Sequence, residues 1–258
     1  NVANSSTSLQ TIGLDLTLNA TRTFSTTSGG GDLWVDGDIG ETGGAWGVTK
    51  SGSGTLTLAG DNSYAGGTSV SSGVLNIRHA DALGTTAGGT FISNNAALEL
   101  QGGLTVAEGI TFNGSGISNG GAIRNLSGDN RLTGPIVLGG NNSSIRSDAG
   151  TLTIASGINR SSGRELILGG AGNITVEGAI DGDNGFSKDG SGTLTFTAAN
   201  TFTSSFYISG GTLNVRHAQA LGSTSSGTTV ADGATLEMQG GITVSGEWLS
   251  LNASGLSG

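Results

Sequence analysis

The chain has 258 residues, of which 50 are Gly, one is Pro and none is Cys, and its formal net charge at pH 7 is −9. The glycine and proline contents are too low for collagen. An apolar fraction of 34%, arranged in short alternating runs, argues against disorder. The acidic charge disfavours nucleic acid as a partner, and the absence of Cys excludes a disulfide framework and a thiolate metal site.

Short strands are predicted along the chain, with apolar residues at alternate positions and Gly, Asn or Ser at the ends. In the first strand, Leu14, Leu16 and Leu18 are expected to share one face. No stretch has the 3.6-residue period of a helix, and none approaches the roughly 20 apolar residues of a membrane-spanning helix. The predicted strands, in chain order, are residues 14–18, 55–58, 74–77, 97–100, 135–138, 151–154, 165–168, 174–176, 193–196 and 213–215.

A long internal repeat organises the chain. Residues 50–106 align without gaps to residues 188–244, an offset of 138, with identity at 29 of 57 positions. The run G-S-G-T-L-T at 52–57 returns at 190–195, and R-H-A at 78–80 returns at 216–218. After one inserted residue near Gly246, residues 113–118 match 252–257, so the copies span about 46–121 and 184–258.

The second copy stops partway, which suggests a piece cut from a longer solenoid. Its terminal coils, before about Leu33 and after about Gly246, are then expected to exchange amide hydrogens fastest, because they expose unpaired strand edges.

We predict an all-β fold, a single elongated right-handed parallel β-helix over residues 1–258. A β-sandwich is disfavoured because the strands are short, similar units recur along the whole chain and aromatic residues are few. About 20–25 residues per coil gives 10–12 coils and a rod of about 50–60 Å. Inward Leu, Ile and Val are expected to stack into apolar ladders, and Gly to serve the turns.

One motif adds a family resemblance. Residues 52–75 read G-S-G-T-L-T-L-A-G-D-N-S-Y-A-G-G-T-S-V-S-S-G-V-L, which closely resembles the passenger-associated transport repeat (autotransporter-associated β-strand repeat) of bacterial autotransporters. The second copy departs from it, with Ala198 for Gly60, Phe202 for Tyr64, and S-S-F for G-G-T at 204–206. The coil is expected to recur there, whereas these substitutions argue against the same tight turn.

The resemblance implies a surface-exposed, non-enzymatic β-helical passenger segment without a cofactor. Such a segment aids secretion and folding, acts as an adhesin stalk, and stays tethered to the bacterial outer membrane or is released. Its partner in the parent chain is then that chain's own C-terminal outer-membrane barrel, through which it is exported. A host surface or glycan is expected as a further partner, and the segment is expected to be a monomer. The alternatives are a glycan- or host-protein-binding module and a β-helix polysaccharide-active enzyme.

No catalytic residue is predicted. His79 and His217 are the only histidines and lie one repeat apart in equivalent R-H-A turns, which indicates a turn role instead of a converging pair. Ser118 lies in G-I-S-N-G, a match to G-x-S-x-G, but no helix pattern follows it.

Asp181 and Asp183, in D-G-D-N-G, are the candidate calcium ligands. A helix-flanked calcium loop would need Glu at its twelfth position, which is Gly192 here, so a solvated acidic turn is favoured. Asp36 and Asp38 occupy the counterpart turn before the first copy.

The remaining candidates are interpreted as structural. Lys50 and Lys188, the only lysines, would be the bases of a polysaccharide lyase, yet they occupy equivalent repeat positions. Glu99 and Glu237 are expected to point outward as solvated strand residues. Rows of Thr-x-Thr fit β-branched ladders better than an ice-binding face. The tryptophans are assigned to packing instead of a sugar platform: Trp34, Trp46 and Trp248.

Overall fold

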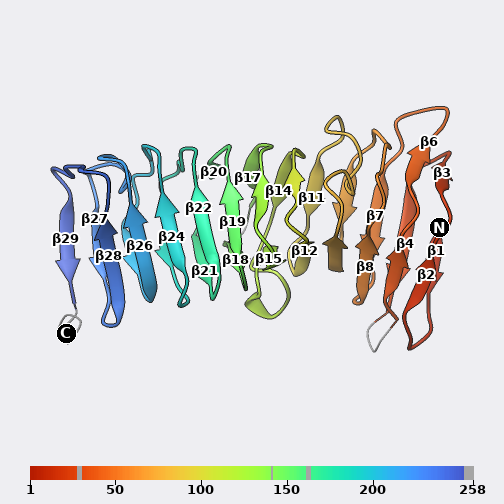
Figure 1. Ribbon diagram of the computed structural model, residues 1–258, viewed down its shortest axis with the longest axis horizontal. Coiled ribbons are helices and arrows are strands. Elements are labelled where there is room, and N and C mark those ends of the chain that lie inside the picture. The colour runs from red at the N-terminus through yellow and green to blue at the C-terminus, as the bar shows by residue number, and fades with distance from the viewer. Residues whose placement is uncertain (28–30, 141, 161–163, 253–258) are drawn as a thin grey trace.

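The computed structural model describes residues 1–27, 31–140, 142–160 and 164–252. It is an elongated stack of parallel strands with the N-terminus at one end and the C-terminal part at the other (Figure 1). The longest sheet of this described part has twelve strands, each beside the strand one coil earlier, so eleven coils separate the first strand from the last. The predicted parallel β-solenoid and its number of coils are confirmed.

The sheets run along the rod and take one short strand from each coil. The twelve-stranded sheet contains β2 (Gln10–Ile12), β5 (Leu33–Val35), β8 (Thr55–Leu58), β10 (Gly73–Ile77), β12 (Ala96–Gln101), β15 (Ile123–Ser127), β18 (Ser143–Ser147), β21 (Leu166–Gly170), β23 (Phe186–Lys188), β25 (Phe206–Ile208), β27 (Gly227–Val230) and β29 (Trp248–Leu251). The eight-stranded sheet contains β1 (Val2–Asn4), β4 (Arg22–Thr26), β7 (Val48–Ser51), β9 (Thr68–Val70), β11 (Thr90–Ile92), β14 (Ile110–Phe112), β17 (Ile136–Leu138) and β20 (Ile158–Arg160). The third face carries the pair β3 (Leu16–Leu18) and β6 (Ile39–Glu41), and then the seven-stranded sheet of β13 (Thr105–Val106), β16 (Asn130–Leu132), β19 (Thr151–Ile154), β22 (Asn173–Val176), β24 (Thr193–Phe196), β26 (Gly211–Val215) and β28 (Ala234–Met238).

All ten predicted strands overlap strands of the structure, and three of them have the same bounds. The prediction that Leu14, Leu16 and Leu18 share one face is wrong for Leu14. Leu14 lies in a bend before β3 and is 74% exposed, because the strand begins only at Leu16. A 3-10 turn, η1 (Ile117–Asn119), interrupts the pattern, and no helix in the described residues has the length and apolarity to cross a membrane.

The core includes a column of aliphatic side chains, one from each of seven successive coils. In-register pairing stacks them along the twelve-stranded sheet, and all are at most 2% exposed. Burying each such side chain stabilises the fold by roughly 1.5–3 kcal/mol. The column runs Leu33, Leu56, Leu75, Leu98, Ile123, Ile145 and Leu168.

The two repeat copies lie on different faces of the solenoid. In copy one, β7 lies in the eight-stranded sheet and β8 in the twelve-stranded sheet; their counterparts β23 and β24 lie in the twelve- and seven-stranded sheets. From β7 to β20 there are five coils, the bridge between Ile158 and Ile180 adds a sixth, and β23 lies one face further on. The repeat therefore spans about six and one-third coils of about 22 residues each. In the match of residues 113–118 to 252–257, residues 253–257 lie outside the described residues, so the structure does not compare the two segments.

Each copy buries a lysine in the core, Lys50 in a column of the eight-stranded sheet and Lys188 in a column of the twelve-stranded sheet. The Lys50 ammonium donates to the carbonyl oxygens of Ser51, Gly52 and Ser72 at 2.9, 2.8 and 3.0 Å. Lys188 makes the same three bonds, to the carbonyls of residues 189, 190 and 210 at 3.0, 3.2 and 2.9 Å. Two of the carbonyls come from the lysine's own turn and one from the next coil, so each ammonium joins two coils. We call these two sites the lysine cages.

A glycine closes each lysine cage. Gly73 has φ +71°, and a Cβ there would lie 2.3 Å from the Gly52 carbonyl oxygen and 2.6 Å from the Lys50 ammonium nitrogen. Gly211, its counterpart, has φ +62° and equally close neighbours. The backbone conformation and the lack of space both require glycine here.

We expect Gly73→Ala to lower the free energy of unfolding by about 2–3 kcal/mol, through left-handed strain and displacement of the cage. Urea unfolding with Gly13→Ala as the control measures this, since a Cβ at Gly13 meets nothing within 4 Å. Equal stabilities of the two variants would contradict the role given to Gly73.

Candidate functional site

Both histidines cap their own turns, as predicted. The Nδ1 atom of His79 accepts the backbone N–H of Asp81 at 3.2 Å, and that of His217 accepts the backbone N–H of Gln219 at 3.1 Å. Among the described residues these are the only hydrogen bonds of the two imidazoles. Within the described part of the chain, neither imidazole is hydrogen-bonded to the other or to a serine.

Ser118 lies in η1, an exposed turn outside the sheets. Its backbone is left-handed, with φ 52° and ψ 32°, and Asn119 follows with φ 61°. A strand-to-helix elbow is missing, because the chain continues into a bend and then β15. The G-x-S-x-G match therefore has no nucleophile context.

Lys50 and Lys188, the candidate bases of the lyase alternative, already donate their hydrogen bonds to backbone carbonyl oxygens. Burial lowers the pKa of both amines to about 8, while neighbouring Asp32 and Asp189 oppose that effect at Lys50 and Lys188 respectively. The three carbonyl oxygens also favour the ammonium form, so each lysine is charged at neutral pH. Neither side chain reaches an open surface, and neither is placed to act as a base.

The outer face of the twelve-stranded sheet carries a charge network instead of isolated solvated acids. Glu99 points outward as predicted, but its side chain is only 12% exposed and accepts from Arg124 at 2.9 Å. Arg124 also pairs with Asp148 from the next coil. Arg146, beside Arg124 in the sheet, binds Asp189 two coils on at 2.9 and 2.7 Å. The network ties successive coils together on the outside.

A polar chain recurs in both copies. Arg78 donates to Asn76, which donates to Glu99, at 3.3 and 3.4 Å; Arg216, Asn214 and Glu237 repeat it at 2.8 and 2.6 Å. Each chain links neighbouring strands on the outside of the stack.

The tryptophans do not form a common platform. Trp34 lies under the Arg78 guanidinium, 4.5 Å from the ring centroid. Trp46 packs against the core and donates to the Thr42 carbonyl at 2.9 Å. Trp248, in β29 at the other end of the rod, is 81% exposed.

The predicted calcium ligands lie beside a buried arginine. The backbone N–H of Arg160 donates to Asp181 at 2.5 Å. Burial lowers the pKa of the Arg160 guanidinium, and the carboxylates of Asp181, Asp183 and Glu165 oppose that effect. A calcium ion would have to compete with this guanidinium. The solvated acidic turn stays the prediction and calcium binding by Asp181 and Asp183 its alternative, which titration with Ca²⁺ would test.

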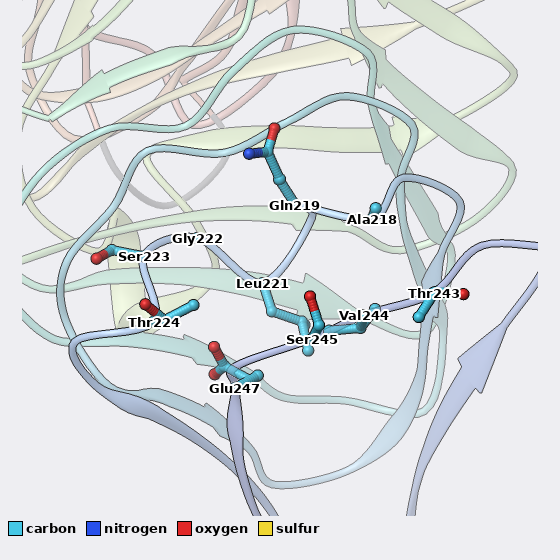
Figure 2. A pocket seen from close by; sticks show the side chains of 10 residues that line it. All are labelled: Ala218, Gln219, Leu221, Gly222, Ser223, Thr224, Thr243, Val244, Ser245 and Glu247. Atoms are coloured by element: carbon cyan, nitrogen blue, oxygen red, sulfur yellow. The ribbon is translucent and has the colours of Figure 1, made fainter.

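A groove of about 570 Å³ lies at the C-terminal end of the described part of the rod, between residues 218–224 and 243–247 (Figure 2). Its one ionisable side chain, Glu247, accepts from Thr228 at 3.0 Å, and burial raises its pKa. In copy one the corresponding Val106 is fully buried under Leu132 of the next coil. The groove therefore has the shape of a stacking face between coils, without a set of converging reactive groups.

Sequence reasoning missed a buried carboxyl group. Glu108 matches Glu247 across the inserted residue and is 3% exposed; neither of its oxygens has a hydrogen bond of good geometry among the described residues. Burial raises its pKa from 4.5 to about 7, partly offset by the backbone N–H of Gly89. The available sign in the sequence was that both copies carry Glu at this position, Glu108 and Glu247. That the next coil covers Glu108 is visible only in the structure.

We expect the free energy of unfolding to fall as pH rises from about 4.5 to about 7, by roughly 3 kcal/mol at most from Glu108. The folded pKa is raised, so the native state binds more protons than the unfolded state in that window. Urea unfolding of Glu108→Gln across pH 4–8.5 should show the wild-type decline removed. The control Glu177→Gln should leave it in place, because Arg131 lowers the pKa of that carboxyl. A decline that survives Glu108→Gln would rule out this assignment.

Two exposed aromatic side chains were also missed. Phe91 is 45% exposed in β11 between Ser69 and Thr111 of the adjacent strands. Tyr207 is 47% exposed in β25, between Ser187 and Thr229. Each copy thus presents one outward aromatic ring in a row of hydroxyl groups, in different sheets.

Comparison with known proteins places these features in a family context. Residues 48–77 and 186–215 match the Passenger-associated-transport-repeat, and these segments run from β7 to β10 and from β23 to β26. The chain is 34% identical over 205 residues to "Adhesin BmaC autotransporter" of Brucella suis biovar 1 (strain 1330), covering 79% of this chain. It spans 5% of that relative's length. No solved structure matches the chain.

Proposed function

Because the chain is a β-solenoid segment of an autotransporter passenger domain, we propose that it is a non-enzymatic stalk that supports an adhesin and aids its secretion. Its location is the bacterial cell surface, tethered to the outer membrane or released. In the parent chain its partner would be a C-terminal outer-membrane barrel. We expect the segment to be a monomer.

The observation that carries this proposal is the nearest-neighbour stacking of the coils. Each strand pairs only with the strand one coil before and one coil after, as β12 does with β10 and β15. Stability is then close to a sum of coil and interface contributions, and folding can propagate from a formed coil to the next. A chain without disulfides that emerges unfolded from a pore can fold in this order.

The test is surface display. The 258-residue chain is placed between an N-terminal epitope and an autotransporter barrel, and the epitope at the surface of intact cells is measured. A scrambled sequence of the same composition is the control. We expect the native chain to deliver several-fold more epitope. Equal delivery by the scrambled chain would refute the role in secretion, and turnover of an acidic polysaccharide by the purified chain would refute the non-enzymatic stalk.

A second candidate function is glycan binding, which the exposed Phe91 and Tyr207 favour. An aromatic ring can cover the apolar face of a sugar, and flanking Ser and Thr hydroxyls can bond its edge. Glycan-array screening of the purified chain tests this. Saturable binding that is lost in Phe91→Ala or Tyr207→Ala supports a glycan-binding module. Binding unaffected by both changes excludes the rows around Phe91 and Tyr207 as the binding site.

A further inference from the structure

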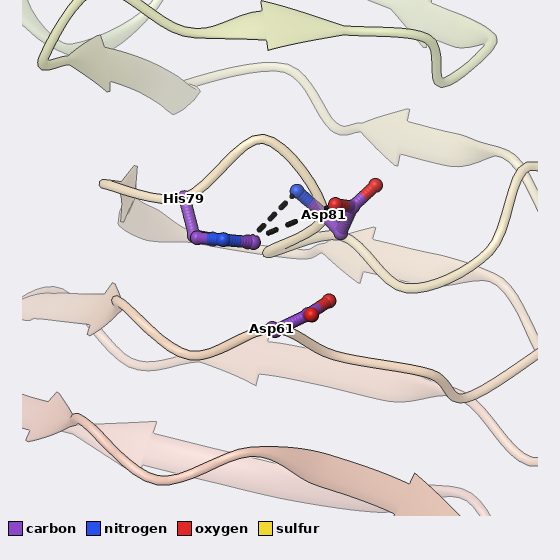
Figure 3. Close-up of side chains that lie close together, drawn as sticks. All are labelled: Asp61, His79 and Asp81. Carbon is purple, nitrogen blue, oxygen red and sulfur yellow. Dashed lines mark hydrogen bonds and ion pairs between the residues drawn. The ribbon is translucent and has the colours of Figure 1, made fainter.

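One corner of the solenoid gathers three metal-ligating side chains that a stalk does not require (Figure 3). Asp61 follows β8, and His79 and Asp81 follow β10 one coil later. One ring nitrogen of His79 and one carboxylate oxygen of each aspartate lie within 4.8 Å of one another. We propose that this corner binds one divalent transition-metal ion, with Zn²⁺ as the best match.

The two carboxylates lack donors from the protein. Among the described residues, no group donates a hydrogen bond to either side chain, and Asp81 Oδ2 is 3.9 Å from His79 Nδ1. Asp38, one coil earlier, bonds the backbone N–H of Asp61 at 2.7 Å and adds negative charge nearby. Both ligand aspartates are exposed, so an ion can reach them from solvent.

The donor set selects the class of ion. Calcium and magnesium prefer sites made of oxygen alone, whereas one imidazole nitrogen with two carboxylates suits zinc and its neighbours. Zinc bonds of about 2.0–2.2 Å require the ligand atoms to lie about 3–4 Å apart. Exposed side chains can close the small remaining difference, and water can complete a four-coordinate site.

The second copy separates the metal hypothesis from a purely structural role. His217 forms the same Nδ1 turn bond, but Gln219 stands in place of Asp81 and Ala199 in place of Asp61. The turn therefore does not need the carboxylates. The next residue along from Asp61 and from Ala199 is a buried asparagine that bridges coils in the same way in both copies: Asn62 and Asn200.

An ion at this corner would join the coil of β8 to the coil of β10 through side chains. Because the three ligands meet only in the folded chain, bound metal stabilises the native state. The proposed stalk would then be reinforced at one corner of copy one, and at no equivalent position of copy two.

Calorimetric titration of the untagged chain with ZnCl₂ in chelator-treated buffer tests the proposal. We expect one ion per wild-type chain and none for Asp61→Ala/Asp81→Gln, which installs the residues that copy two already carries. The reciprocal Ala199→Asp/Gln219→Asp should bind a second ion. Thermal unfolding should shift upward with Zn²⁺ in the wild type but not in Asp61→Ala/Asp81→Gln.

Equal stoichiometry and affinity in the wild type and Asp61→Ala/Asp81→Gln would overturn the proposal, as would wild-type binding only at millimolar Zn²⁺. Should the loss variant fail to fold, the reciprocal variant decides: an unchanged count of ions overturns the site. Ca²⁺ is the comparison ion, expected to bind at least tenfold more weakly, and tighter Ca²⁺ binding would refute the choice of zinc. Because these readouts concern the metal alone, the stalk proposal can fail independently in the display experiment.

Discussion

Replacing Lys50 and Lys188 together by methionine should lower the free energy of unfolding by about 3–12 kcal/mol, half from each lysine cage. Each replacement leaves three carbonyl oxygens without the ammonium ion that now joins them. Hydrogen bonds from a charged donor contribute about 1.5–3 kcal/mol each. The three bonds of one cage together therefore stabilise the fold by more than burial of the ammonium charge destabilises it.

The opposing effect is relief of the buried charge. Burial lowers the pKa of each lysine from 10.5 to about 8, which corresponds to roughly 3 kcal/mol that methionine would recover. The difference is a net loss of about 1.5–6 kcal/mol per cage. The cages lie more than six coils apart, so the two losses should add.

The control is Arg131→Met, which removes one positive charge from an exposed ion pair with Glu177. Such exposed pairs contribute little to stability, because water screens both charges. Hydrogen exchange should show protection lost around β7–β10 for Lys50→Met and around β23–β26 for Lys188→Met. An effect of Lys50→Met no larger than that of the control would show that water caps the carbonyls equally well.

The strands could be predicted because their signal is local. Alternation of apolar and polar residues over four or five positions, bounded by Gly or Asn, specifies a strand wherever the chain runs. Lys50 and Lys188 did not fit this reading. They occupy columns of the core, with Lys188 directly following Leu168, and alternation alone assigns a lysine to solvent. The only two lysines lie one full repeat apart, and this was the available sign of their structural role.

The placement of the copies on different faces could not be predicted. It depends on the summed length of every coil between β7 and β23, and these coils differ in their loops, including the one that contains η1. A single residue more or less in each loop leaves local patterns unchanged but turns the second copy around the rod. Equivalent surface residues such as those at 91 and 229 therefore lie in different sheets.

The corner of Asp61, His79 and Asp81 was hidden for the same reason. Its ligands come from consecutive coils, and their approach depends on a coil length that no short motif encodes. The sequence did hold one sign, since copy two keeps the histidine turn but changes both aspartates. Glu108 was hidden because burial under a following coil is a property of the stack.

The copies also differ in how they fill the core at one corner. Copy one has a polar pair, in which the Tyr64 hydroxyl lies 2.6 Å from Thr68 Oγ1. Copy two has Phe202 and Phe206 at these positions, and their rings meet edge-on at 5.9 Å. The departure from the motif at 204–206 thus preserves the coil, because β25 takes the place of β9. Both members of the pair change together, so no buried hydroxyl loses its partner.

Phe186 is the centre of this aromatic cluster, and we expect Phe186→Ala to lower the free energy of unfolding by about 3–5 kcal/mol. Its ring stacks on Phe206 at 4.4 Å and meets Phe202 edge-on at 5.1 Å. The side chain is 2% exposed, and the Arg160 guanidinium lies 5.2 Å from its ring centroid. Truncation leaves a cavity that strands fixed by their neighbours above and below cannot close.

Two variants separate the cavity from the loss of an aromatic ring as such. Phe186→Val, which installs the residue that copy one carries at Val48, should cost less than alanine because it fills part of the space. Tyr207→Ala removes an exposed ring and should cost less than about 1 kcal/mol. Because coils interact only with their neighbours, hydrogen exchange should quicken from β21 to β25 while β8–β12 stay protected. A uniform loss of protection along the rod would instead mean that the solenoid unfolds as one unit, and would contradict the nearest-neighbour stacking on which the proposed stalk rests.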